Sequence, residues 1–252
     1  MKFRLILACV ALVSLSACSS SPEEEIDNTR VSDVEASYAR AQRSMESGNF
    51  NLALQTMTAL STRYPFGPLT NQIQLDLIYL YYKTGDLDKA LSTIDRFTRL
   101  NPNHQSIDYA LYMRGLTNER TLENFFQELA GIDRADRDVT KAREAFDDYA
   151  ELVRRFPDSK YAADARQRML GLKSRLARHE LAVARYYIKR EAFLAAANRA
   201  KYVLENFADM KESEHALGIM IQAYNSLNLE ELAADAQATL RQNFPQSAYL
   251  NN

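Results

Sequence analysis

The segment from Leu75 to Pro102 reads LDLIYLYYKTGDLDKALSTIDRFTRLNP and decides the fold. An apolar helical pattern runs up to Gly85, a second one starts after Asp86, and Pro102 ends it. Glycine readily takes the positive φ that the end of the first helix requires. The small Ala90 lets the second helix pack closely against the first, and proline cannot continue a helix. The segment therefore predicts one helical hairpin.

The turn, contact and stop residues of this hairpin recur along the chain at the same offsets. The turn positions are Gly48, Gly85, Glu191 and Asn228. Asparagine tolerates the left-handed conformation at such a turn, whereas the glutamate identifies its copy as degenerate. The other contact and stop residues are Ala53 and Pro65, Ala145 and Pro157, Ala196 and Ala208, and Ala233 and Pro245. This pattern is typical of the tetratricopeptide repeat, which has a period of about 34 residues. We predict an all-α superhelical solenoid of about five tetratricopeptide-like hairpins, with repeats at 34–67, 71–104, 108–157, 158–209 and 212–245.

Two of these repeats are longer than the regular interval of 37 residues between successive stops. Pro157 lies 55 residues beyond Pro102, so the third repeat holds 18 additional residues, since 55 − 37 = 18. We place them at 121–140 and expect a short amphipathic helix, which either carries binding or fills a gap in the core. In the fourth repeat no proline interrupts residues 158–190, so we expect an extended helix there. Whether it is one helix or two remains open.

The first 17 residues have the features of a signal peptide. Lys2 and Arg4 precede an apolar run that ends at Ala17, and this run is shorter than the roughly 20 residues a membrane-spanning helix needs. The ending Leu-Ser-Ala-Cys18 resembles the lipobox of bacterial lipoproteins, which implies cleavage before Cys18 and its acylation. Ser19 after the cysteine implies sorting to the outer membrane in those lipoproteins. We expect 18–32 to form a flexible acidic tether and 33–252 a single repeat domain.

Composition argues against several functional classes. Removing Lys2 and Arg4 from 31 basic and 33 acidic residues leaves 29 against 33, a net charge near −4, so nucleic acid is not an expected partner. The three histidines are scattered and the only cysteines are Cys9 and Cys18, so no metal site is expected. Seven glycines form no phosphate-binding loop, and we expect no cofactor and no enzymatic activity. A helical cell-wall hydrolase would need a further catalytic domain.

Repeat hairpins bind other proteins in a concave groove lined by the first helix of each hairpin. Tyrosine offers broad contact area with a polar tip, which suits an extended or β-prone peptide, although each tyrosine could equally belong to the core. The candidate groove residues are Tyr38, Gln42, Tyr79, Tyr82, Lys83, Tyr112 and Arg120.

Several longer motifs are more specific than the repeat pattern. They are Arg63-Tyr-Pro-Phe-Gly-Pro68, Gln74-Leu-Asp-Leu-Ile-Tyr79 with Tyr81-Tyr-Lys83, Asp95-Arg-Phe97 with Arg99-Leu-Asn-Pro102, Met113-Arg-Gly-Leu-Thr-Asn118, and Asp133-Arg134 with Asp136-Arg-Asp138. With them the chain resembles the tetratricopeptide-repeat lipoproteins of the outer-membrane β-barrel assembly machinery, from the lipobox to at least Phe207. The last hairpin is divergent.

The resemblance implies a scaffold on the periplasmic face of the outer membrane of a Gram-negative bacterium, held there by its lipid anchor. Its implied partners are the POTRA domains of BamA, the lipoproteins BamC and BamE, and unfolded outer-membrane proteins. The family's arginine that contacts the POTRA domains corresponds here to Arg199 of the Asn198-Arg199 pair. Arg199 lies off the predicted packing stripe of alanines, so we expect it to be free to reach an acidic partner. The alternative is another tetratricopeptide lipoprotein, a pilotin-like protein or an adaptor for a peptidoglycan enzyme.

Overall fold

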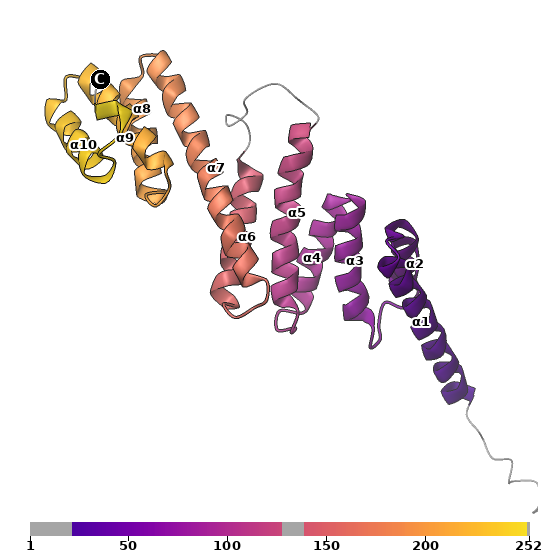
Figure 1. The fold of residues 1–252 in the computed structure, drawn as a ribbon. Coiled ribbons are helices and arrows are strands. Elements are labelled where there is room, and N and C mark those ends of the chain that lie inside the picture. The colour runs from indigo at the N-terminus through magenta and orange to yellow at the C-terminus, as the bar shows by residue number, and fades with distance from the viewer. Residues whose placement is uncertain (1–21, 128–138, 251–252) are drawn as a thin grey trace, which may run out of the picture. The chain divides into compact units, whose positions relative to one another are not determined.

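The structure is a computed structural model that describes residues 22–127 and 139–250 (Figure 1). In those ranges it is all-α, as predicted, and contains ten α-helices, one short 3-10 helix and no β-strand. The helices follow one another as five hairpins: α1 (Pro22–Glu46) and α2 (Phe50–Arg63), α3 (Thr70–Thr84) and α4 (Leu87–Leu100), α5 (Ile107–Gln127) and α6 (Thr140–Arg155), α7 (Ala162–Lys189) and α8 (Phe193–Asn206), and α9 (Glu212–Ser226) and α10 (Glu230–Asn243). The hairpins lie over the expected repeat ranges, except that α1 begins at Pro22, well before residue 34.

Four of the hairpin turns are closed in the same way. The predicted turn residues Gly48, Gly85, Glu191 and Asn228 all have positive φ, between 56° and 85°. In each turn the following backbone N–H donates to the carbonyl five residues earlier, for example Asp86 to Tyr81 at 3.0 Å and Ala192 to Tyr187 at 3.0 Å. This bond defines a Schellman motif, which satisfies a carbonyl that the helix leaves unpaired. Glutamate at 191 therefore occupies the glycine position of the same turn.

The second helix of every hairpin ends before its predicted stop residue. Tyr64, Asn101, Phe156 and Phe244 cap these helices with φ between −129° and −136°, and each directly precedes a proline. A residue before proline avoids the helical region, so the chain leaves the helix there. Phe207 has φ −135° as well, although Ala208 rather than a proline follows it, so the degenerate copy ends with the same cap geometry.

The chain divides into two compact units, residues 1–73 and 74–252. In the first unit α1 packs against α2, and Ala41, the predicted contact residue Ala53, and Met57 are fully buried. Helix α1 begins at Pro22, so residues 22–32 of the expected flexible tether are helical. Proline is favoured at the first position of a helix, and the acidic residues that follow it suit the positive end of the helix dipole.

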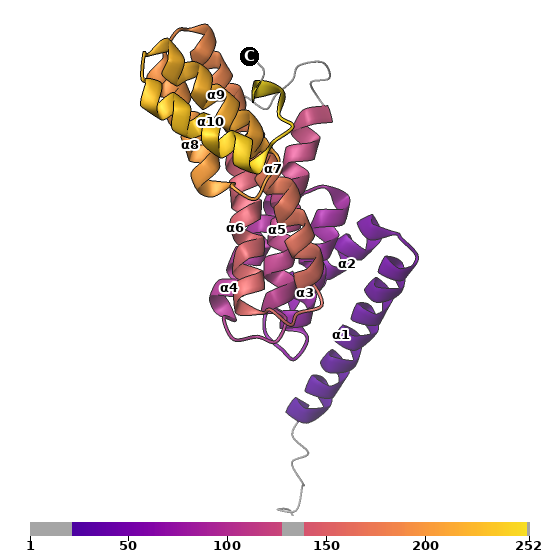
Figure 2. The ribbon, with the colours of Figure 1, turned by 60° about the vertical axis from the view of Figure 1, so that its left-hand side comes forward.

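The second unit is built by consecutive helices that pack against their neighbours, α4 against α5 and onward in order to α10 (Figure 2). One cluster of buried apolar residues runs through it from Leu75 to Leu240. The predicted contact residues Ala90, Ala145 and Ala196 have no exposed surface, so all three belong to the packed interior.

The two long repeats differ from the expectations in detail. Residues 121–127 continue α5 without a break, so the first part of the predicted insertion is not a separate short helix. Residues 128–138, which include the rest of the insertion, lie outside the described residues. Over 158–190 the chain forms the single 28-residue helix α7, and Gly171 lies within it. Neither segment contains a proline, so nothing in them forces a helix to end.

The predicted signal peptide and Cys18 also lie outside the described residues. Among the helices that are described, none combines the length and the apolar character that crossing a membrane requires.

Candidate functional site

The first-helix residues of the second unit form pairs rather than free side chains. On α3 the Lys83 ammonium lies 5.5 Å from the centroid of the Tyr79 ring. Between α3 and α5 the guanidinium of Arg120 lies 5.0 Å from the Tyr82 ring centroid, and Arg120 Nη1 also donates a hydrogen bond to the backbone carbonyl of Tyr82. Both arrangements are cation–π contacts. The predicted residues thus form two pairs, Tyr79 with Lys83 within α3 and Tyr82 of α3 with Arg120 of α5.

Tyr112 belongs to a second cluster, which joins α5 to α7. Its hydroxyl donates to Asp164 Oδ2 at 2.6 Å, and its ring stacks on that of Tyr161 with centroids 4.8 Å apart. Arg168 Nε donates to the same Asp164 oxygen at 2.6 Å, and Arg168 Nη1 donates to Glu119 Oε2 at 2.9 Å. Asp164 therefore accepts hydrogen bonds from both Tyr112 and Arg168, and Arg168 in turn connects Asp164 of α7 to Glu119 of α5.

Burial and hydrogen bonding set the charge states in this cluster. Burial, followed by the hydrogen bond to Asp164, raises the pKa of Tyr112 to about 12. Burial alone would raise the pKa of Asp164, but the hydrogen bonds from Tyr112 and Arg168 outweigh it, and the pKa of Asp164 is lowered. At neutral pH, Tyr112 is therefore a neutral donor and Asp164 an ionised acceptor.

The remaining predicted first-helix residues, Tyr38 and Gln42, lie on α1 in the first unit. Both are half-buried, and Gln42 Nε2 lies 2.6 Å from the Tyr38 hydroxyl, to which it donates. They form one polar pair on one turn of helix.

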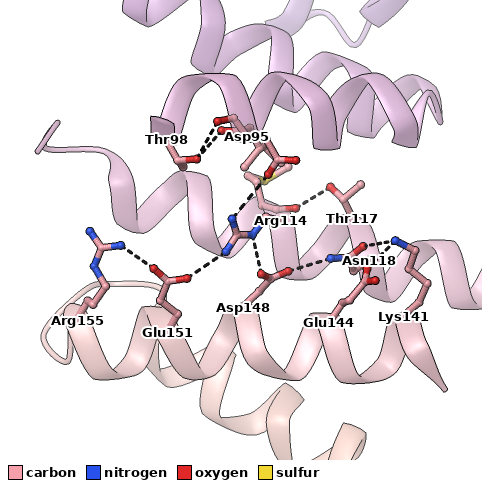
Figure 3. A network of polar contacts seen from close by, with 12 residues as sticks. Asp95, Thr98, Arg114, Thr117, Asn118, Lys141, Glu144, Asp148, Glu151 and Arg155 are labelled. Atoms are coloured by element: carbon pink, nitrogen blue, oxygen red, sulfur yellow. Dashed lines mark hydrogen bonds and ion pairs between the residues drawn. The ribbon is translucent and has the colours of Figure 1, made fainter. Parts of the chain in front are cut away.

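A motif that carries the family resemblance, Met113 to Asn118, builds a structural network between three helices (Figure 3). Arg114 Nε donates to Asp148 Oδ1 at 2.6 Å and its Nη2 donates to Glu151 Oε2 at 3.1 Å, while Asn118 donates to the other Asp148 oxygen at 2.9 Å. Arg114 also lies 3.7 Å from Asp95 on α4. Burial raises the pKa of Asp148, because its pairing with Arg114 only partly offsets the loss of water. The motif thus joins α4, α5 and α6.

The Asn198-Arg199 pair lies on α8 and both residues are exposed. The alanine stripe on the other side of the helix, Ala196, Ala197 and Ala200, is buried, so Arg199 does lie off the packing stripe as predicted. It is not free, however. Arg199 Nη1 donates to Glu180 Oε2 of α7 at 2.9 Å, and the side chain of Glu180 is only 7% exposed whereas that of Arg199 is 47% exposed.

The acidic partners of the predicted residues Tyr112 and Arg199 were not predicted from the sequence. Acidic residues on amphipathic helices are usually solvated, so the amphipathic pattern does not distinguish Asp164, Glu119 and Glu180 from the other carboxylates. One signal was available: Asp164 and Arg168 are four residues apart on one helix, a spacing at which opposite charges meet. No comparable spacing links Glu180 to Arg199, which is 19 residues further along and on another helix.

The fold defines a protein of the tetratricopeptide-like class, an all-α repeat protein built of helical hairpins, and contacts such as Tyr112–Asp164 and Arg199–Glu180 join its helices. No cluster of three or more potential metal-ligating side chains occurs in residues 33–121 and 139–250. The comparison with known families then identifies the chain more closely. Residues 31–240 match the YfiO family, described as outer membrane lipoprotein. The chain belongs to this family.

Named relatives extend the match to nearly the whole chain. The chain is 44% identical over 233 residues to the outer membrane protein assembly factor BamD of Vibrio cholerae, covering 92% of this chain and 94% of that protein. It is also 44% identical over 250 residues to BamD of Neisseria gonorrhoeae, covering 98% and 94%. Among solved structures, PilW, a type IV pilus biogenesis factor, matches at 13% identity and a TM-score of 0.39, over 86% of this chain and 96% of that one. The family to which the chain belongs is one of assembly factors rather than of enzymes.

Proposed function

We propose that this protein is a non-enzymatic scaffold of the β-barrel assembly machinery. The observation that carries the proposal is the 44% identity to assembly factor BamD across at least nine-tenths of both chains. A repeat fold of packed hairpins suits this role because it offers extended surfaces for several partners at once.

In the proposed arrangement the acylated Cys18 holds the protein on the periplasmic face of the outer membrane. Several acyl chains anchor a protein far more firmly than a single one. Arg199, with Asn198 beside it, contacts an acidic group of the BamA POTRA domains, and other surfaces bind the lipoproteins BamC and BamE. The exposure of Asn198 and Arg199 on α8 supports this contact.

The second part of the proposal concerns unfolded outer-membrane proteins. We place their binding on the first-helix residues Tyr79, Tyr82 and Lys83 of α3 and Tyr112 and Arg120 of α5 in the second unit, and, as a separate contact of the first unit, on Tyr38 and Gln42 of α1. Aromatic rings paired with cations supply flat contact area whose polar atoms stay in reach of a peptide backbone. The half-buried rings of Tyr79, Tyr82 and Tyr112 support this placement.

Depletion of the protein from its own bacterium tests the function. We expect folded, heat-modifiable barrel proteins to fall in the outer membrane, and a plasmid-borne copy to restore them. The membrane lipoprotein pool as a whole should stay constant in the same cells. Undiminished barrel assembly in fully depleted cells contradicts the proposal.

The same cells test the peptide surface. A copy carrying Tyr79→Ala and Tyr82→Ala should restore assembly only partly while remaining folded. Tyr81→Ala is the matched control, because Tyr81 is on the same helix but its ring lies 5.7 Å from the Lys89 ammonium instead. Equal restoration by both copies removes Tyr79 and Tyr82 from the proposed surface.

A further inference from the structure

Glu180 occupies a position where a carboxylate is costly. It lies on the buried side of α7 among Ala177, Leu181 and Ala184, and only 7% of its side chain is exposed. A carboxylate removed from water needs a compensating partner. Among the described residues that partner is Arg199 of α8, at 2.9 Å.

The pair is asymmetric, and the asymmetry determines what Arg199 presents to the outside. Glu180 is buried and accepts from one guanidinium nitrogen of Arg199, Nη1. Within the described part of the chain Arg199 makes no other hydrogen bond or ion pair, and about half of its side chain is exposed. Its planar guanidinium carries five donors in a fixed fork, so donors on Nε and Nη2 remain for a second acceptor.

We propose that Glu180 is the positioning residue of the Arg199 contact, and that it holds the guanidinium with its free donors directed to a carboxylate of the POTRA partner. The inference rests on the proposed function, because it takes Arg199 to be a contact with BamA. An exposed arginine loses side-chain freedom when it binds, and this cost lowers affinity. Because the ion pair with Glu180 already restricts Arg199 in the unbound protein, less freedom remains to be lost.

The buried carboxylate also complicates the obvious test. Replacing Arg199 alone, by alanine or glutamate, leaves Glu180 buried and unpaired, which is strongly destabilising. A loss of binding in such a variant would then report unfolding as readily as a lost contact. Glu180 must therefore be changed first.

Glu180→Leu removes the carboxylate while nearly keeping its volume, in surroundings that are already apolar. Exchange of a buried ion pair for packed apolar groups is usually neutral or stabilising, so the variant should fold and melt at or above the temperature of the native chain. Glu180→Gln is the conservative counterpart, because its amide oxygen can still accept from Arg199 Nη1.

The experiment titrates the purified, lipidated full chain in detergent with the soluble POTRA fragment of BamA from the same bacterium, by calorimetry. Ordering one long side chain on binding costs an amount that corresponds to about a 3- to 10-fold change in affinity. We expect Glu180→Leu to bind about that much more weakly and Glu180→Gln to bind within about twofold of the native chain. Affinity in Glu180→Leu equal to or above the native value overturns the positioning role, and so does an equal loss in Glu180→Gln.

A double variant distinguishes a failure of the positioning role of Glu180 from a failure of the proposed contact between Arg199 and BamA. Glu180→Leu with Arg199→Ala lacks the arginine but leaves no buried carboxylate unpaired. If it binds more weakly than a Glu180→Leu chain that itself binds normally, Arg199 contacts BamA and only the positioning role is wrong. If the native chain, Glu180→Leu and the double variant all bind alike, the Arg199 contact itself is wrong. The inference is supported if Glu180→Leu binds the POTRA fragment more weakly than the native chain while Glu180→Gln keeps its affinity. This holds whether or not the double variant loses further affinity.

Discussion

Tyr112 shows how a single side chain can link a candidate binding surface to the stability of the fold. Its ring packs against the core and stacks on Tyr161, while its hydroxyl donates to Asp164. Two neighbouring tyrosines share this environment: burial raises the pKa of both Tyr109 and Tyr149. The neutral phenol is therefore the form that the folded state prefers at all three positions.

This preference makes stability depend on alkaline pH. The pKa of Tyr112 is raised to about 12 from a usual value of 10, so its contribution is complete below pH 10 and is lost as the pH rises through 12. Tyr112→Phe, which cannot donate to Asp164, should lower the free energy of unfolding at pH 7 by about 1–2 kcal/mol. We expect this difference from the native chain to shrink above pH 10, as urea unfolding at a series of pH values will measure.

Tyr186→Phe is the control for that series, because Tyr186 is 55% exposed on α7. It should cost little at any pH, as surface substitutions usually do. A Tyr112→Phe deficit that stays constant from pH 8 to above pH 11 contradicts the pKa argument.

For single residues, the sequence predicts on which face of a helix a side chain lies better than it predicts which side chain it contacts. That Arg199 lies off the alanine stripe follows from helical periodicity, and the structure agrees. That Glu180 pairs with it does not follow, because the contact depends on the rotation of α7 against α8. Tyr112 and Asp164 are 52 residues apart, and no local spacing encodes their meeting. Arg199 is exposed, but it is not free, because it forms an ion pair with Glu180.

At the scale of elements, close packing between helices depends on two glycines that lie inside them. A Cβ atom built on Gly115 of α5 would lie 2.5 Å from the Tyr149 ring of α6. A Cβ on Gly218 of α9 would lie 2.5 Å from the ring of Tyr249, in the short 3-10 helix Ala248–Leu250. In both places the absent side chain makes room for an aromatic ring.

Gly115→Ala should therefore be destabilising. Tyr149 is fully buried and donates to Glu119 at 3.0 Å, so its ring cannot move away without breaking other contacts. We expect a loss of about 1–3 kcal/mol in the free energy of unfolding, the usual cost of overpacking, measured by chemical denaturation.

Gly171→Ala provides the opposite case on α7. Nothing lies within 4 Å of a Cβ built there, and the residue is within a regular helix. Alanine should then gain up to about 1 kcal/mol through helix propensity alone. If both variants shift stability in the same direction, the Tyr149 contact is not what excludes a side chain at Gly115.

The elements themselves were largely predictable, because each signal was local. Glycine or asparagine at a turn and proline at a stop act within a few residues, and the structure places both where the offsets predicted. Two helices differ from the expectation: α1 already begins at Pro22, where no apolar pattern marks a helix, and α5 continues to Gln127, so residues 121–127 are not part of a separate short helix.

The whole molecule consists of two compact units that meet within the sequence of α3. The buried apolar cluster of the second unit takes its members from Leu75 to Leu240 and none from the described side chains of the first unit, residues 33–73. In repeat proteins each hairpin is stabilised mainly by its immediate neighbours. The second unit therefore has the core it needs within its own sequence, and sequence composition alone did not show this division.

A fragment from Thr70 to Asn252, which starts with the complete α3, should fold without the first hairpin. We expect circular dichroism to show a helical fragment with one cooperative thermal transition, because the whole apolar cluster is retained. A second fragment from Ile107 removes α3 and α4 as well, and with them Leu75, Ile78, Ile94 and Phe97 of the same cluster. It should melt at a clearly lower temperature, since it loses core contacts rather than a neighbouring unit. A non-cooperative transition in the longer fragment, or equal stability of the two, contradicts the division into these units.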